Sequence, residues 1–248
     1  MLGISLIVPS IRIEHWDRVL DSMSSACTKY PFEIIFIGPV ANTECKAIKQ
    51  DNVSFIQSLA SPNKCQQIGL VNAKFDIVTH FADDCMFVPN IIDKCIDALM
   101  EEPDNKKHVV LTKYTEGNDI LHGDDYYRLI NAYPKAQYIN PEWWIFNSAI
   151  FWAEYIKYLG GWDTRFQVPC LGHADLAVRA QRDGVKVSFI KESLCHCEHG
   201  QSDHMPIELS HGYEDAPLYQ YIHHTVPDRI RIDLDNYKYT PDVWRRTV

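Results

Sequence analysis

The 248-residue sequence has no long apolar run, is short of basic residues and contains few glycines. A bilayer span needs about 20 consecutive apolar residues, so we expect no transmembrane segment, which leaves peripheral membrane contact open. Lys and Arg number 24 against 33 Asp and Glu, a net charge of −9. Because such a chain repels a polyphosphate backbone, we expect no nucleic-acid partner, whereas a nucleotide-sized anion needs only a local site.

Glycine is also missing from the turn after the first predicted strand, which reads Pro9-Ser10-Ile11-Arg12. This argues against a dinucleotide dehydrogenase, which needs a glycine-rich turn there, and against a sugar nucleotidyltransferase, which carries a glycine-rich loop with Arg and Lys. We expect no secretory leader before that strand, and most of the eight cysteines lie in apolar runs. We therefore expect a cytoplasmic protein with mostly free thiols.

What the sequence does contain is an ordinary globular composition, with 46% apolar and 23% charged residues. In the first hundred residues, apolar strand-like runs alternate with helical spacing. Strands are predicted at 4–8, 32–37, 53–57 and 76–81, and helices at 14–27, 42–50, 62–73 and 89–100. The alternation predicts an α/β fold, a mostly parallel central sheet flanked by helices, with ligands bound beyond the carboxyl ends of the strands.

The second half is less regular. A strand is predicted at 109–114, a helix at 174–183 and a strand at 185–190, whereas 147–158 mixes strand and helix signals. The last forty residues have no strong period.

Asp83-Asp84 follows the fourth predicted strand, where a ligand is expected. One carboxylate can accept a hydrogen bond from a ribose hydroxyl, and the other can bind a hard divalent cation that bridges two phosphates. The alternative is a solvated Asp-Asp turn. The position at a strand end favours the ligand site.

Six segments, in order, resemble motifs of the family 2 glycosyltransferases of the GT-A fold. They are SLIVPS at 5–10, FEIIFI at 32–37, NKCQQIGLVNAKFD at 63–76, ADDCMFVPN at 82–90, LGGWDTRF at 159–166, and DLAVR at 175–179 followed by Gly184. The match spans roughly residues 4–202. It implies a GT-A domain over 1–204, with a nucleotide-binding half (about 1–100), an acceptor half (about 101–204), and a C-terminal extension, 205–248, packed on the same domain.

The resemblance also implies a donor site. Asp83 would meet the ribose or uracil side of a nucleoside-diphosphate sugar, with UDP the expected nucleotide. Asp84 would hold Mn²⁺ or Mg²⁺ against the diphosphate, and His196 would complete the metal site, with His199 as the alternative. The remaining donor contacts are assigned to Pro9, Ser10, Asn63 and Lys64. The implied activity is inverting transfer of the sugar to a hydroxyl of a glycan or another acceptor.

Two departures from the family pattern stand out. The acidic residue that often follows the second strand is replaced by Gly38-Pro39-Val40, so recognition of the base must differ. The Glu-Asp-x-Asp motif is replaced by Gly172-His173-Ala174-Asp175. His173 aligns with the usual base, and Asp175 serves if the loop shifts by two residues. Both also suit structural roles at a helix start. The alternative function is a protein that binds nucleotide sugar without turnover.

Two further groups of residues have chemistry to offer. Cys195-His196-Cys197-Glu198-His199, followed by His204 and His211, could hold zinc, but the spacing departs from C-x₂-C. In a strand, residues 195 and 197 face one way and His196 the other. Trp143-Trp144 could stack on a sugar acceptor or serve in packing. The Tyr, His and Trp content of 205–248 suggests an acceptor-side cover or a homodimer contact.

Overall fold

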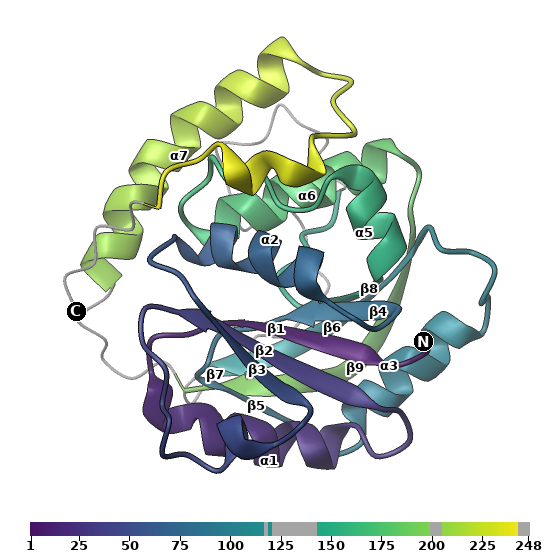
Figure 1. Ribbon diagram of the computed structural model, residues 1–248. Coiled ribbons are helices and arrows are strands. Elements are labelled where there is room, and N and C mark those ends of the chain that lie inside the picture. Colours follow the sequence, from purple (N-terminus) through teal and green to yellow (C-terminus); the bar gives the residue numbers. More distant parts are fainter. Residues whose placement is uncertain (117–118, 121–142, 199–204, 243–248) are drawn as a thin grey trace.

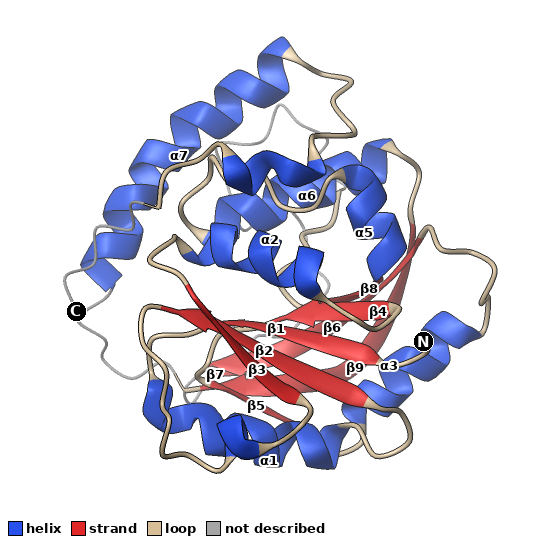
Figure 2. Cartoon of the chain, in the orientation of Figure 1, coloured by secondary structure: helices blue, strands red, loops and turns tan. Residues whose placement is uncertain are grey.

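The computed structural model describes residues 1–116, 119–120, 143–198 and 205–242, without the side chains of 116, 119–120 and 205–214. A twisted sheet forms the middle layer (Figures 1 and 2). Its strands are β1 (Ile4–Pro9), β2 (Phe32–Gly38), β3 (Val53–Gln57), β4 (Ile77–His80), β5 (Cys85–Phe87), β6 (His108–Glu116), β7 (Asp119–Ile120), β8 (Ala149–Trp152) and β9 (Lys186–Cys197).

Helices cover both faces of this sheet. The α-helices are α1 (Trp16–Ala26), α2 (Pro62–Asn72), α3 (Ile91–Met100), α5 (Ala153–Leu159), α6 (Pro169–Arg182) and α7 (Met205–Thr225), and short 3-10 turns span Ile13–His15, Ala47–Lys49 and Leu234–Lys238. Figure 1 shows α2, α5 and α6 on one face and α1 and α3 on the other. None of the helices in the described ranges is long and apolar enough to cross a membrane.

The strand order is β3-β2-β1-β4-β8-β6-β9-β5, with β7 paired to β6. Strands β1 to β4 are mutually parallel, as are β6 and β9, whereas β8 runs antiparallel to both of its neighbours and β5 runs antiparallel to β9. The predicted α/β fold with a mostly parallel sheet is confirmed. Because β1 and β4 are parallel neighbours, the chain leaves both strands at the same edge of the sheet.

Burial explains the first strands and helices. Ile4, Leu6 and Val8 are fully buried, as a strand covered on both faces requires. On α1, Trp16 stacks on Phe36 of β2 with ring centroids 4.3 Å apart. The helical spacing of apolar residues in α1 therefore corresponds to the face that packs on the sheet.

The predicted helix at 42–50 is wrong, since only Ala47–Lys49 forms a 3-10 turn there. The Asn42 side chain accepts hydrogen bonds from the backbone N–H groups of Glu44 and Cys45, both at 3.2 Å. Asp17 of α1 accepts the N–H of Ala47 at 2.8 Å. Such side-chain bonds compete with helix formation.

The C-terminal segment lies along α2, α5 and α6. Tyr219 and Ile222 of α7 join a small apolar cluster with residues of α6. The backbone N–H of Ile232 donates to the Leu159 carbonyl at 3.0 Å. Next to it, Gly160 has φ +88°, and a Cβ there would lie 2.2 Å from the Ile232 carbonyl oxygen. The turn after α5 therefore needs glycine on both counts.

Candidate functional site

Asp83 anchors the turn that follows β1. Its Oδ2 accepts hydrogen bonds from the Ser10 hydroxyl at 2.9 Å and from the backbone N–H groups of Ile11 and Arg12 at 2.7 and 2.5 Å. The Trp16 indole N–H donates to the same Ser10 hydroxyl at 2.7 Å. Asp83 is only 1% exposed. This carboxylate thus joins the ends of β4 and β1 into one rigid edge.

Arg12 bridges the two aspartates. Its Nη1 lies 2.8 Å from Asp83 Oδ1 and 3.4 Å from Asp84 Oδ2, and its side chain is 24% exposed. The Arg12 guanidinium therefore lies between two buried carboxylates, where a bound cation would also be attracted. A ribose hydroxyl that reaches Asp83 Oδ1 must compete with this guanidinium.

The end of β9 runs beside Asp84. Cys85 and Met86 of β5 pair with Cys197 and His196 of β9, and the Glu198 N–H donates to the Asp84 carbonyl at 3.0 Å. The His196 Nδ1 lies 2.8 Å from the Thr115 hydroxyl on β6. That contact orients the ring, as partners of metal-binding imidazoles commonly do. A carboxylate and an imidazole on neighbouring chain segments suit Mn²⁺.

The other members of the predicted histidine group are not placed. His199 and His204 lie outside the described residues, and so does the side chain of His211.

A close backbone approach explains the missing acidic residue after β2. A Cβ at Gly38 would lie 1.9 Å from the Ser10 carbonyl oxygen. Pro9, the last residue of β1, is paired with Ile37 just before it. No side chain fits at position 38 unless the turn at Ser10 moves.

Asn63 and Lys64 lie in the first turn of α2, which Ser61 caps. The Asn63 amide donates to the Asp163 carbonyl at 2.6 Å, while its buried Oδ1 has no hydrogen-bond partner among the described residues. The Lys64 ammonium bonds the Thr240 carbonyl and pairs with Asp242 at 2.7 Å. The C-terminal segment thus holds the ammonium that sequence reasoning assigned to the donor.

His173 belongs to a buried polar cluster at the start of α6. Its Nε2 lies within 3.0–3.2 Å of the Gln66 amide, and its Nδ1 is 3.2 Å from Asn147 Oδ1. The His80 ring at the end of β4 lies 4.2 Å away, centroid to centroid. Burial, with the neighbouring His80, holds the pKa of His173 well below its usual value, and burial lowers the pKa of His80 to about 3. Both rings are neutral near pH 7.

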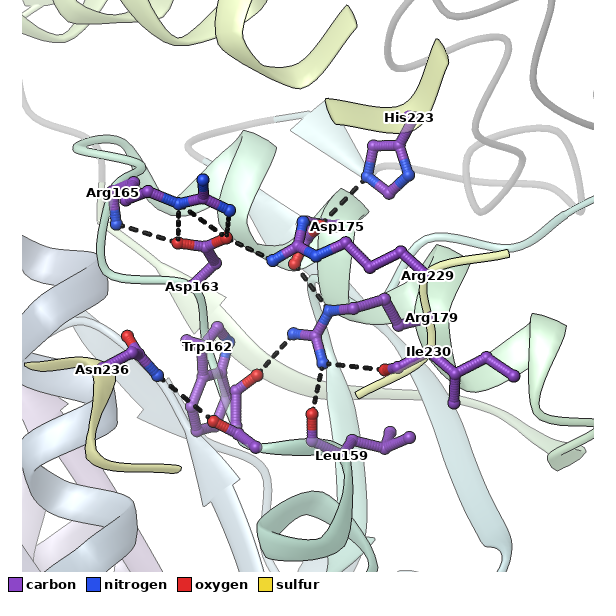
Figure 3. Close-up of polar contacts among 12 residues, drawn as sticks. Leu159, Trp162, Asp163, Arg165, Asp175, Arg179, His223, Arg229, Ile230 and Asn236 are labelled. Carbon is purple, nitrogen blue, oxygen red and sulfur yellow. Dashed lines mark hydrogen bonds and ion pairs between the residues drawn. The ribbon is translucent and has the colours of Figure 1, made fainter. Parts of the chain in front are cut away.

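Asp175 lies at the centre of a buried ion network (Figure 3). Its carboxylate pairs with Arg179 at 2.8 Å and Arg229 at 2.7 Å and accepts from His223 at 3.0 Å. Arg229 also reaches Asp163, which Arg165 holds from outside. Burial alone would raise the pKa of Asp175, but the two guanidinium charges and the His223 hydrogen bond hold it well below its usual range.

Trp143 and Trp144 pack against the C-terminal half of α6. The Arg182 guanidinium lies 5.7 Å from the Trp143 ring. The Trp144 backbone exchanges two 2.8 Å hydrogen bonds with the Gln181 amide, and its ring lies edge-on to Phe189 of β9 at 4.7 Å. These contacts belong to the far end of α6 from His173.

Comparison with known proteins bears on this arrangement. No protein-family model matches the sequence, and no curated protein matches it. Among solved structures, a fragment of S. aureus TarS, residues 1–349, in complex with UDP aligns with TM-score 0.59 and 15% identity over 89% of this chain and 65% of that one. The same fragment with UDP-GlcNAc aligns at 0.55 and 17%, over 83% and 61%. The chain has the GT-A fold.

The match to a longer S. aureus TarS chain covers 89% of this chain but only 39% of that one, so this chain spans well under half of its length. In the GT-A fold shared by the two, the edge where β1 and β4 end carries Asp83, Asp84 and Ser10. His173 and Asn63 lie with α2 and α6. Trp143 and Trp144 lie neither at the edge that carries Asp83 nor beside His173 and Asn63.

Sequence reasoning missed three features of this region of the molecule. Arg12 reads as part of a turn, and its contact with Asp83 leaves no local signal because the two residues are 71 positions apart. His80 sits in a strand, where a histidine reads as ordinary. Arg229 gave no signal at all, because its partner Asp175 is 54 residues away in the sequence.

Proposed function

We propose that the protein is a metal-dependent, inverting glycosyltransferase that moves a sugar from a nucleoside-diphosphate sugar to an acceptor hydroxyl. The observation that carries this proposal is the buried Asp83-Asp84 pair, fixed to the turn after β1 at the shared carboxyl end of β1 and β4. Ligands of open α/β sheets bind at that edge. The structural likeness to TarS, which was solved with UDP and with UDP-GlcNAc, supports UDP as the nucleotide.

Asp84 and His196 would hold Mn²⁺ or Mg²⁺. Their fit rests on donor chemistry, since one is a carboxylate 2% exposed beside a second carboxylate and the other an imidazole oriented by Thr115. When bound, the ion acts as a Lewis acid on the leaving diphosphate. A metal ion bound between the two carboxylates would displace the Arg12 guanidinium, which could then pair with the phosphates of the donor.

Lys64 would bind the donor by exchanging partners. Its ammonium now pairs with the half-exposed Asp242 carboxylate. A diphosphate offers more negative charge than one carboxylate, so it can replace that partner. Ser10 and Pro9 would delimit the side of the site that holds the base. Asn63 is fully buried, so its Oδ1, which has no hydrogen-bond partner among the described residues, would accept from a donor hydroxyl only if the start of α6 moves.

His173 is the better of the two candidate bases. It is 7% exposed, whereas Asp175 is fully buried and bonded to Arg179, Arg229 and His223. A neutral imidazole can accept the proton of the acceptor hydroxyl while the acceptor oxygen attacks the anomeric carbon and the diphosphate leaves from the opposite side. The alternative, binding of nucleotide sugar without turnover, draws support from the lowered pKa of His173, which makes it a weak base.

Calorimetric titration with UDP, GDP, CDP and dTDP, each with and without Mn²⁺, tests the donor site. We expect one nucleotide to bind, and only with the metal. Release of the nucleoside diphosphate from the matching sugar nucleotide, measured in wild type and in His173→Gln, tests the chemistry. The variant should lose turnover and keep donor affinity. Binding without diphosphate release by the wild type would favour the alternative, and no binding of any nucleotide would defeat the proposal.

A further inference from the structure

Three cysteine thiols converge between β5 and β9, next to the acidic pair. Cys85 lies directly opposite Cys197 in the antiparallel register, and their sulfurs are 3.1 Å apart. Cys195, two residues before Cys197 on the same face of β9, places its sulfur 3.9 Å from that of Cys197. The three sulfurs all lie within 4.8 Å of one another.

The spacing of these sulfurs suits a metal ion. A tetrahedral zinc ion with Zn–S bonds of about 2.3 Å separates its sulfur ligands by about 3.8 Å. The Cys195–Cys197 sulfur distance, 3.9 Å, matches that value, and the Cys85–Cys197 distance, 3.1 Å, is shorter, so the Cys85 sulfur would have to move outward by less than 1 Å. Two residues of one strand and one residue of its partner thus bring three sulfurs within reach of a single ion, without the C-x₂-C spacing typical of zinc sites.

The surroundings also favour a cation. Asp84 Oδ1 lies 3.8 Å from the Cys85 sulfur, which gives the group an oxygen neighbour with negative charge. All three cysteines are at most 5% exposed. A thiophilic ion that displaces the three thiol protons would bond all three sulfurs at once.

We propose that Cys85, Cys195 and Cys197 bind one thiophilic divalent cation of the zinc class. Binding releases the thiol protons and forms three metal–sulfur bonds, with the fourth position open to the Asp84 carboxylate or to water. This site differs from the one proposed for Mn²⁺, which uses oxygen and nitrogen ligands. One consequence rests on the proposed function: an ion that recruits Asp84 withdraws it from the diphosphate-bound metal and weakens nucleotide binding.

Cadmium titration tests the site directly. The full chain, reduced and stripped of metal with a chelator, is titrated with Cd²⁺ while the ultraviolet thiolate-to-cadmium charge-transfer absorption is followed. We expect saturation at one equivalent, with zinc displacing the signal. Cys85→Ser, Cys195→Ser and Cys197→Ser should each weaken Cd²⁺ binding at least tenfold.

Cys27→Ser is the matched control. Cys27 is also buried, its thiol donates to the Tyr30 carbonyl at 3.3 Å, and a serine hydroxyl can make the same bond. It should titrate like wild type. Should a cluster variant fail to fold, native mass spectrometry of the wild type with Zn²⁺ gives the stoichiometry independently.

Three results would overturn the proposal. These are no charge-transfer band in the wild type, an equal band in the cluster variants, and a Cys85–Cys197 disulfide found by intact mass in place of bound metal. Because the absorption signal needs no nucleotide, loss of the transferase proposal would leave this measurement unaffected. Asp84→Asn then reports the fourth ligand, since the band persists with lower affinity if the carboxylate takes part.

Discussion

Asp84 and Asp175 are both buried aspartates beside an arginine, yet their surroundings differ in kind. Asp84 lies at the end of the sheet, with the Arg12 guanidinium 3.4 Å away and 24% exposed. Asp175 is enclosed by Arg179 and Arg229, whose side chains are at most 7% exposed. The first arrangement can exchange its cation for a ligand. The second is held by Arg179, one helical turn away, and by Arg229, 54 residues away in the sequence, as in a structural ion network.

The comparison of Asp84 with Asp175 shows that the position of a residue in a family motif does not by itself determine whether it is structural or binds a ligand. Both aspartates lie in segments that resemble motifs of one family, and sequence reasoning gave both a functional task. Their partners separate them, because a carboxylate that already accepts from two guanidinium groups and a histidine has little acceptor capacity left for a substrate.

The largest expected effect is on the stability of the Asp175 network. Asp175→Asn leaves the buried Arg179 without its counter-charge and Arg229 with Asp163 alone, which should cost about 3–5 kcal/mol of unfolding free energy. Urea denaturation followed by circular dichroism measures it. Asp84→Asn is the matched comparison and should lose much less. If the two variants were equally stable, the proposed division between a structural and a ligand-binding aspartate would not hold.

Sequence patterns predict those elements whose partners are close in the chain. The strands β1 to β4 and the helices α1 and α3 follow from their own apolar spacing. Helix α7 was missed because its apolar residues keep no single face and Pro217 interrupts it. Its place is fixed by packing on α6 instead, through Tyr219 and Ile222. A pattern read along one segment contains no information about that contact.

The site divides in the same way. Asp83-Asp84 could be found from sequence, since a strand end selects it from other acidic pairs. The grouping of Cys85 with Cys195 and Cys197 could not, because Cys85 and Cys197 are 112 residues apart and meet only through the register of β5 and β9. The same holds for Lys64 and Asp242. Long-range pairing decides which of many polar side chains share a site.

The next effect concerns ligand binding at the other aspartate. Asp84→Asn should weaken Mn²⁺-dependent nucleotide binding at least a hundredfold, about 2.8 kcal/mol, because an amide is a poorer metal ligand than a carboxylate. Calorimetry with the nucleotide selected by the wild type measures this. Asp97→Asn, a surface change on α3, is the control and should bind normally. Unchanged affinity in Asp84→Asn would remove Asp84 from the metal site.

Lowering the pH should destabilise the protein through a third region, the buried histidines His80 and His173. His80 has a folded-state pKa of about 3 against 6.5 for an ordinary histidine, and burial also depresses the pKa of His173. The unfolded chain therefore binds more protons below pH 6.5, so stability falls as the pH drops from there, by roughly 1–2 kcal/mol per histidine by pH 5. The Asp175 carboxylate, with its pKa lowered from 3.8, stays charged throughout this range.

Urea denaturation at pH 7, 6 and 5 measures that loss. Burial also lowers the pKa values of His108 and His223, so the wild-type slope includes them. His80→Gln should flatten the slope relative to wild type, since it removes one of the protons taken up on unfolding. A slope identical in the variant would show that His80 is not the titrating group.

The smallest effect should come from the outer edge of the Asp175 network. Arg165 makes a bidentate pair with Asp163, at 3.0 and 2.7 Å, but its side chain is 52% exposed. Water replaces such a partner readily, so Arg165→Ala should cost at most about 1 kcal/mol. Arg229→Ala removes the guanidinium that joins Asp163 to Asp175 from inside and should cost roughly 3 kcal/mol or more. Equal losses in the two variants, measured by urea denaturation, would mean that burial is not what separates these arginines, and the contrast drawn between the two aspartate regions would lose its physical basis.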